Sequence, residues 1–195
     1  LQFKRVCMFI NEHRDLMKKL FNIKVNLSSL DLMRSDCSSH FIRMMDDMDI
    51  HHDWIQFEIT ETVATEYNAG LGMVIDGFMA AGVRLCLDDF GSGYANLNTV
   101  MRLPFSAIKI DRTLLFDICN DKKRAMFYQS IVETFHRMGY SIVSEGVETE
   151  EEMSLLSSWG VDMIQGYYYG KPMPETECLR YIRRMHFAKE EYGKS

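Results

Sequence analysis

Short apolar segments alternate with amphipathic segments along the whole 195-residue chain, and this alternation limits the folds that the chain can adopt. The apolar segments are rich in Val, Ile, Leu and Phe, as buried strands are, and the intervening segments carry apolar residues at helical spacing. The predicted strands are Ile23–Leu27, Ile55–Ile59, Arg84–Leu87, Ala107–Ile110, Ser141–Ser144 and Asp162–Ile164. The clearest predicted helices are Val63–Ala81, Lys122–Met138 and Glu150–Trp159. Strands that alternate with helices in this way are parallel and are joined by crossover connections.

Two architectures contain such units: an open doubly wound sheet and a TIM-type (β/α)8 barrel. The first predicted strand is not followed by G-x-G-x-x-G, and the units are short and evenly repeated, which favours the barrel. The first residues already follow a helical pattern without a capping residue: Phe3, Val6, Cys7, Ile10, Met17 and Leu20. We therefore expect an α/β fold in which residues 1–195 form one partial domain. It would be a (β/α)8 barrel truncated at its N-terminus, with about six units present and the first two strands missing.

The net charge limits the possible binding partners, and the cysteines indicate the cellular compartment. The 22 Lys and Arg residues and 28 Asp and Glu residues give a net charge of −6, with no basic run. Duplex nucleic acid is therefore excluded as a partner, because its binding depends on clustered positive charge. No apolar stretch approaches the roughly 20 residues that cross a bilayer, and no signal sequence opens the chain. The five scattered cysteines form no C-x-x-C pair, so we expect reduced thiols and a cytoplasmic location, on the cytosolic face if the parent protein is membrane-anchored.

Polar residues gather where the predicted strands end. They are Asn26, Glu58, Glu61, Asp88, Asp89, Lys109, Asp111, Glu145, Glu148 and Gln165. In a barrel the C-terminal strand ends form the face that carries the active site. A single acidic residue at such a place is usually a helix N-cap or a solvated loop residue, whereas converging carboxylates repel one another and need a cation. The set as a whole therefore indicates a cation site.

The donor types indicate hard divalent cations. Carboxylate and amide oxygens suit Mg²⁺ or Mn²⁺, whereas zinc would favour His or Cys. The adjacent carboxylates of Asp88 and Asp89 could bridge two ions, and two ions roughly 3.5–4 Å apart would polarise a phosphodiester and generate the attacking hydroxide. Lys109 would orient that water or stabilise charge on the phosphate.

Six motifs, in this order, resemble those of the EAL-domain family of cyclic di-GMP phosphodiesterases: VNLSS, FEITE, LDDFGSGY, IKID, SEGVET and IQGYYYGKPMP. The resemblance runs from about Ile23 to about Pro174. It implies a metal-dependent barrel that hydrolyses cyclic di-GMP to linear pGpG in bacterial second-messenger signalling, with two Mg²⁺ or Mn²⁺ ions and inhibition by Ca²⁺. It also implies a homodimer, and a GGDEF or sensory domain upstream in the parent protein.

The resemblance assigns a role to most of the strand-end residues. Asn26, Glu58 and Asp88 would hold the first ion, and Asp88 would bridge to the second ion, which Asp89 and Glu145 also hold. Lys109 would contact the catalytic water, with Gln165 near the water and the substrate. Asp111 and Glu148 would supply supporting hydrogen bonds.

Glu61 would anchor the loop Phe90–Asn96, which in the family links substrate binding to the dimer interface. Ser92, Ala95 and Asn96 stand where that loop more often has Thr, Ser and Ser, and these are mild changes.

The chain departs from the family in one respect, because the Glu-Ala-Leu motif that gives the family its name is absent. The chain therefore also lacks one ligand of the first ion and a substrate-binding arginine that the family has there. Either the parent protein has the motif and this chain is a fragment, or the protein is a degenerate relative. The complete set of downstream ligands favours a fragment, which alone would have weak activity or none, because its first ion lacks a carboxylate and its barrel has exposed sheet edges.

Three alternatives to hydrolysis by the parent protein stay open. The domain could bind cyclic di-GMP as a catalytically inactive receptor, or it could act only as a protein-interaction domain. Metal-dependent barrels of the enolase or aldolase type share the acidic pattern, although they fit the six ordered motifs poorly.

Overall fold

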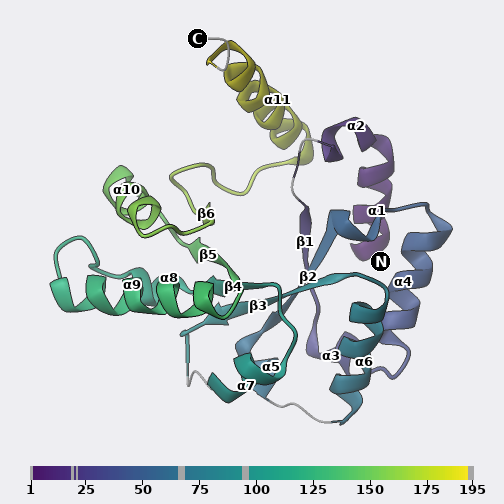
Figure 1. Cartoon of the computed structure of the whole chain (residues 1–195). Coiled ribbons are helices and arrows are strands. Elements are labelled where there is room, and N and C mark those ends of the chain that lie inside the picture. The colour runs from purple at the N-terminus through teal and green to yellow at the C-terminus, as the bar shows by residue number, and fades with distance from the viewer. Residues whose placement is uncertain (1, 19, 21, 66–68, 94–96, 193–195) are drawn as a thin grey trace.

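The computed structural model describes residues 2–18, 20, 22–65, 69–93 and 97–192. Its six strands form one sheet in the order β1-β2-β3-β4-β5-β6, and every neighbouring pair is parallel. The strands are β1 Ile23–Asn26, β2 Ile55–Thr60, β3 Arg84–Phe90, β4 Ala107–Ile110, β5 Ser141–Glu145 and β6 Met163–Gln165. Figure 1 shows them at the centre of the molecule, with the helices around the outside. This sequential parallel order is the one expected for successive units of a barrel wall.

All six predicted strands are present, and their ends differ from prediction by a few residues. The largest difference is at β3, which was predicted to end at Leu87 and continues to Phe90. Pairing with β4 shifts register between Leu87 and Phe90, and Asp89 within this irregular stretch has a φ of 58°. A bulge of this kind inserts a residue into a strand and lies beyond what apolar periodicity can predict.

Each strand is followed by one or more helices. They are α3 Ser29–Leu32, α4 Cys37–Asp47, α5 Glu61–Thr65, α6 Ala69–Ala80, α7 Leu97–Arg102, α8 Arg112–Leu115, α9 Lys122–Arg137, α10 Glu150–Ser158 and α11 Glu175–Tyr192. Helices α1 Gln2–Glu12 and α2 Arg14–Met17 precede β1, and the short 3-10 helix His52–Trp54 precedes β2. None of the helices in the described ranges is both long and apolar enough to cross a membrane.

One helical prediction was wrong in its continuity. The pattern from Phe3 to Leu20 belongs to two helices, because the backbone at His13 leaves the helical region (φ −129°, ψ 36°) between α1 and α2. Apolar spacing continues across His13, so it could not reveal this break. The helix predicted for Val63–Ala81 includes α5 and α6, and the stretch that joins them lies outside the described residues.

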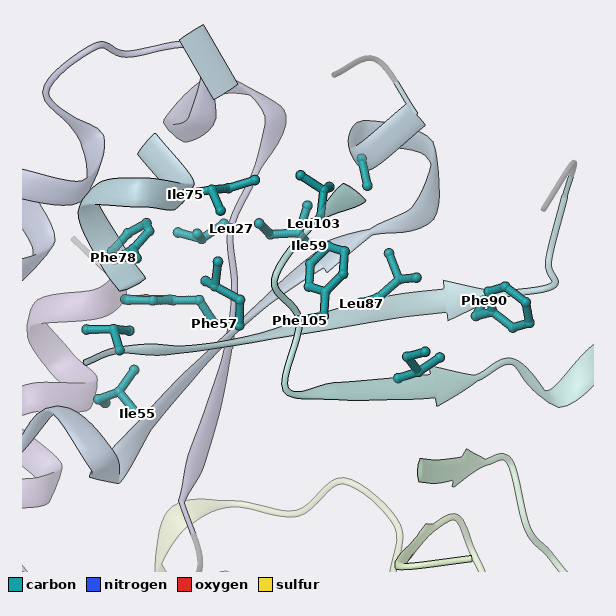
Figure 2. Packing of buried hydrophobic residues seen from close by; sticks show 14 of the residues in the cluster. Leu27, Ile55, Phe57, Ile59, Ile75, Phe78, Leu87, Phe90, Leu103 and Phe105 are labelled. Carbon is teal, nitrogen blue, oxygen red and sulfur yellow. The ribbon is translucent and has the colours of Figure 1, made fainter. Parts of the chain in front are cut away.

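The main core lies between the sheet and the helices outside it. Phe57 of β2 contacts the rings of Phe3 in α1, Phe41 in α4 and Phe78 in α6, with centroids 4.9–5.3 Å apart. Figure 2 shows Phe57 near Phe78 and the extension of the core along β3 to Phe90. Successive side chains of a strand point to opposite faces, so residues between the outward apolar positions face the inside of the sheet. On β2 these inward residues include Glu58, which is buried.

Candidate metal centre

Four inward side chains meet near the carboxyl ends of four neighbouring strands. Because the strands are parallel, these ends share one edge of the sheet. The ammonium Nζ of Lys109 on β4 lies 2.8 Å from Asp88 Oδ1 on β3 and 2.7 Å from Glu145 Oε1 on β5. It also lies 3.1 Å from Glu58 Oε1 on β2, so one buried cation joins three carboxylates from three strands.

Burial dominates the electrostatics of this cluster. It raises the pKa of both Glu58 and Glu145, and the positive charge of Lys109 opposes that shift. Burial alone would lower the pKa of Lys109, but hydrogen bonds to Asp88 and Glu145 and the charge of Glu58 raise it above its ordinary value. Lys109 therefore stays charged among three carboxyl groups.

Asp89 adds a fourth carboxylate because the backbone is irregular there. In a regular strand Asp88 and Asp89 would point to opposite faces. The positive φ of Asp89 turns it instead, and carboxylate oxygens of Asp88, Asp89 and Glu145 lie within 4.8 Å of one another. Burial raises the pKa of Asp89, and the charges of Asp88 and Asp111 add to that shift. Aspartate tolerates this left-handed conformation better than most residues do.

The donors fit a hard divalent cation. Three carboxylates converge within bonding reach of a common point, and oxygen donors of this type are the usual ligands of Mg²⁺ and Mn²⁺. Glu58 Oε1 is buried and accepts no hydrogen bond, although Lys109 lies at ion-pair distance from it. The Lys109 ammonium compensates this buried oxygen only in part, and a bound cation would complete the compensation.

Two predicted site residues lie beside this cluster without joining it. Asn26 at the end of β1 is in register with Glu58, and Gln165 at the end of β6 is in register with Glu145. Both side chains are exposed, and neither forms a hydrogen bond to another described residue. The strand register thus places them at the two ends of the same edge.

Three further predicted residues have structural partners. Glu61, the first residue of α5, is buried, and its Oε2 accepts a hydrogen bond of 3.0 Å from the backbone N–H of Gly91. Asp111 caps α8 by accepting a hydrogen bond of 2.9 Å from the Thr113 N–H. The backbone N–H of Glu148 donates to a carboxylate oxygen of Glu152 at 2.9 Å. Of the loop differences, Ser92 is within the described residues, whereas Ala95 and Asn96 are outside them.

Lys24 was not among the predicted site residues. Its Nζ lies 3.9 Å from Glu58 Oε1, so a second ammonium group stands beside that carboxylate. The signal was present in the sequence, because Lys24 precedes Asn26 by two residues on the same strand and therefore shares its face. Lys24 lies inside β1 and not at its carboxyl end, where the predicted site residues gather.

A cavity of about 240 Å³ opens beside the cluster, next to Glu145. Its lining residues are Asp111, Arg112, Glu145, Gly146, Glu148, Gln165, Gly166 and Tyr167. Gly166 lets the chain pass close to its neighbour here, since a Cβ at this position would lie 2.0 Å from the Val147 carbonyl oxygen. A larger open cavity of about 760 Å³ shares Arg112, Gly146 and Glu148 with it but touches none of the four clustered carboxylates.

A second group of potential ligands lies outside the sheet. Carboxylate and imidazole atoms of Glu12, His13 and Glu175 also come within 4.8 Å of one another, but both glutamates are exposed. Glu175 is the first residue of α11, where an acidic side chain is favoured by the helix dipole without any ion.

Comparison with known proteins identifies the domain. The EAL domain family profile matches residues 1–172. The chain is 30% identical over 162 residues to a cyclic di-GMP phosphodiesterase of Pseudomonas aeruginosa, covering 83% of this chain and 28% of the relative. It is 31% identical to MucR of the same organism, a bifunctional diguanylate cyclase/cyclic di-GMP phosphodiesterase, covering 82% of this chain and 23% of the relative. The chain thus spans about a quarter of the length of these curated relatives.

Solved structures agree with this match. The PaMucR phosphodiesterase in complex with c-di-GMP superposes with a TM-score of 0.81 and 29% identity, over 90% of this chain and 71% of that one. The EAL enzyme Bd1971, in its cAMP- and cyclic-di-GMP-bound form, superposes with a TM-score of 0.85 and 25% identity, over 92% of this chain and 50% of that one. The expected TIM-type α/β class is confirmed by the match to solved EAL-domain structures. The profile match over most of the sequence shows that the chain belongs to the EAL domain family.

Proposed function

We propose that this domain hydrolyses cyclic di-GMP to linear pGpG with two Mg²⁺ or Mn²⁺ ions bound at the carboxyl ends of its strands. The observation that carries the proposal is the buried cluster in which Lys109 contacts three carboxylates while Asp89 turns toward two of them. The family supports the substrate, because relatives with this domain are named cyclic di-GMP phosphodiesterases.

The ligands would divide into two overlapping sets. Asn26, Glu58 and Asp88 would hold one ion, and Asp88, Asp89 and Glu145 would hold the other. The second set is supported by its converging oxygens, and the first by the buried oxygen of Glu58 that accepts no hydrogen bond. Divalent cations bound there supply the positive charge that polarises a phosphodiester and activates water.

Lys109 and Gln165 would act on the water and the substrate. The Lys109 ammonium contacts three carboxylates, so it would be able to donate to a water or a phosphate oxygen once bound divalent cations took its place on one of them. Gln165 and Tyr167 both line the cavity beside Glu145, where an amide and an aromatic ring could contact a guanine. Glu61 would be a positioning residue that acts through the Gly91 backbone.

The proposal is tested by incubating the full protein that contains this domain with cyclic di-GMP and Mg²⁺ or Mn²⁺, with EDTA as the metal-free reference, and separating the products by chromatography. We expect pGpG with either ion and none in EDTA. Residues 1–195 alone should show weak turnover or none. Asp89→Asn should remove most of the turnover, whereas Asp47→Asn, the same change at an exposed carboxylate of α4, should not. A protein that binds both Mn²⁺ and cyclic di-GMP yet forms no pGpG would overturn the proposed hydrolysis.

The second candidate is a receptor that binds cyclic di-GMP without cleaving it. The observation in its favour is the charge around Glu58, where the ammonium groups of Lys24 and Lys109 already neutralise the carboxylate. Calorimetry would favour this candidate if cyclic di-GMP bound tightly and chromatography detected no product in saturating Mn²⁺.

The assembly and location follow from the proposed function. We infer a homodimer in the cytoplasm, with a GGDEF or sensory domain elsewhere in the full protein. The exposed apolar side chains Met126 and Phe127 on α9 support a protein contact on that helix. Light scattering would test the dimer, and a monomer at micromolar concentration would contradict it.

A further inference from the structure

Two ammonium groups approach the same carboxylate oxygen. Lys109 Nζ lies 3.1 Å from Glu58 Oε1, and Lys24 Nζ lies 3.9 Å from it. Lys109 is also bound to Asp88 and Glu145, so its charge is shared among three carboxylates. Lys24, by contrast, forms its ion pair with Glu58 alone among the described residues.

The strand register explains how Lys24 reaches this position. Lys24 pairs with Gln56, and Asn26 pairs with Glu58, in the parallel ladder between β1 and β2. Lys24 and Asn26 share the inner face because they are two residues apart. The long side chain of Lys24 therefore extends from the level of Gln56 toward the level of Glu58. Its side chain is 22% exposed and that of Glu58 is 5% exposed, so water screens this pair only partly.

A cation near Glu58 and the ammonium of Lys24 would repel each other. The repulsion between a divalent ion and an ammonium group a few ångströms away is strong where burial lowers the effective dielectric constant. The other proposed ion would be held by Asp88, Asp89 and Glu145. Lys109 contacts ligands of both sites, whereas Lys24 forms no ion pair with these three carboxylates in the described structure. The two proposed ions therefore differ in their electrostatic surroundings.

We propose that Lys24 is a positioning residue whose ammonium group pairs with Glu58 when no cation is bound there. Its charge makes the ion site at Asn26 and Glu58 the weaker of the two. The site formed by Asp88, Asp89 and Glu145 fills first, and the site at Glu58 fills only at higher ion concentration. Activity would then depend on the concentration of free divalent cation through the Glu58 site. This inference rests on the proposed metal centre.

The test is a titration with Mn²⁺ in the absence of nucleotide, with free Mn²⁺ measured by electron paramagnetic resonance. All proteins carry His13→Ala, which removes the imidazole from the separate donor group at Glu12 and Glu175. We expect two sites of unequal affinity in the reference protein. Lys24→Met removes the charge and keeps an unbranched apolar side chain, and it should tighten the weaker site about tenfold or more while leaving the stronger site unchanged. Lys24→Arg, which keeps the charge, should bind Mn²⁺ as the reference protein does.

The control is Lys18→Met, because Lys18 also pairs with one carboxylate, that of Asp15 at 3.1 Å, but at an exposed position. It should leave both affinities unchanged. Near-ultraviolet circular dichroism checks the fold of each variant, and Lys24→Gln replaces Lys24→Met if the latter is unfolded.

The outcomes separate this inference from the proposed metal centre. If the reference protein binds Mn²⁺ and neutral variants at Lys24 bind it equally or more weakly, the role of Lys24 is wrong while the metal centre stands. If only the neutral variants bind a second ion, the inference is supported. If no protein in the series binds Mn²⁺, both the metal centre and the role of Lys24 are overturned.

Discussion

The backbone N–H of Gly91 donates a hydrogen bond of 3.0 Å to the side chain of Glu61, which joins the chain just after β3 to the start of α5. Gly91 follows Asp89 by two residues, and its φ of 89° favours glycine. The buried carboxylate of Glu61 therefore helps to fix the turn that leaves the Asp88–Asp89 pair.

Replacement of Glu61 should affect turnover more than metal binding. Glu61→Ala leaves the Gly91 N–H without this acceptor, which should destabilise the protein by about 1–3 kcal/mol and lower kcat. Mn²⁺ affinity should change little, because Glu61 is not one of the proposed ligands. Urea unfolding, Mn²⁺ titration and steady-state kinetics measure the three quantities, and a large loss of Mn²⁺ affinity with unchanged kcat would contradict the positioning role.

Removal of the Lys109 ammonium should make the protein depend on divalent ions for its stability. Lys109→Met leaves Glu58, Asp88 and Glu145 without the cation that they share, so the metal-free protein should lose about 3–5 kcal/mol. Mn²⁺ should then raise Tm more in the variant than in the wild type, although turnover should be lost. Thermal unfolding in EDTA and in Mn²⁺ measures both effects. An equal rise in Tm for the two proteins would contradict this account of the cluster.

Asp89 should bind the metal ion, but its charge should destabilise the folded protein when no metal is bound. Asp89→Asn keeps a residue that tolerates positive φ and removes a negative charge beside Asp88. The metal-free variant should therefore be at least as stable as the wild type, while its Mn²⁺ affinity should fall by about 10–100-fold. Asp47→Asn, at an exposed position of α4, is the matched control. Unchanged Mn²⁺ binding in Asp89→Asn would remove Asp89 from the ligand set.

The raised pKa of Glu145 predicts how the free energy of unfolding depends on pH. Burial raises the pKa of Glu145 above its ordinary value of 4.5. A carboxyl group with a raised pKa in the folded state stabilises the fold fully below the ordinary value, and this contribution is lost as pH rises through the raised value. The metal-free wild type should therefore lose free energy of unfolding, relative to Glu145→Gln, as pH increases from 4.5 toward neutrality.

Urea unfolding of both proteins in EDTA across this pH range measures the difference, and taking the difference cancels the titration of distant groups. Saturating Mn²⁺ should reverse the trend in the wild type, because the ion binds the charged carboxylate. A wild type that gains stability relative to Glu145→Gln as pH rises in EDTA would show that the fold favours the charged form.

The amino-acid sequence by itself determined the repeated strand and helix units and the residues available for a site. Local periodicity predicted all six strands, because alternating and helical spacings reflect which side of one element is buried. The conclusion that polar residues at the strand ends share one edge followed from parallel pairing, and the structure brings Glu58, Asp88, Lys109 and Glu145 together. The roles of Asn26 and Gln165, which lie at the ends of that edge, stay predictions.

The tertiary structure alone decided the details on which the chemistry depends. Periodicity would place Asp88 and Asp89 on opposite faces, and only the irregular pairing of β3 with β4 turns Asp89 toward Glu145. Spacing along β1 puts Lys24 on the inner face with Asn26, but its approach to Glu58 depends on the register between β1 and β2. Contacts of this kind form between strands that are distant in the chain, so local spacing specifies which residues face inward but not which charges meet there.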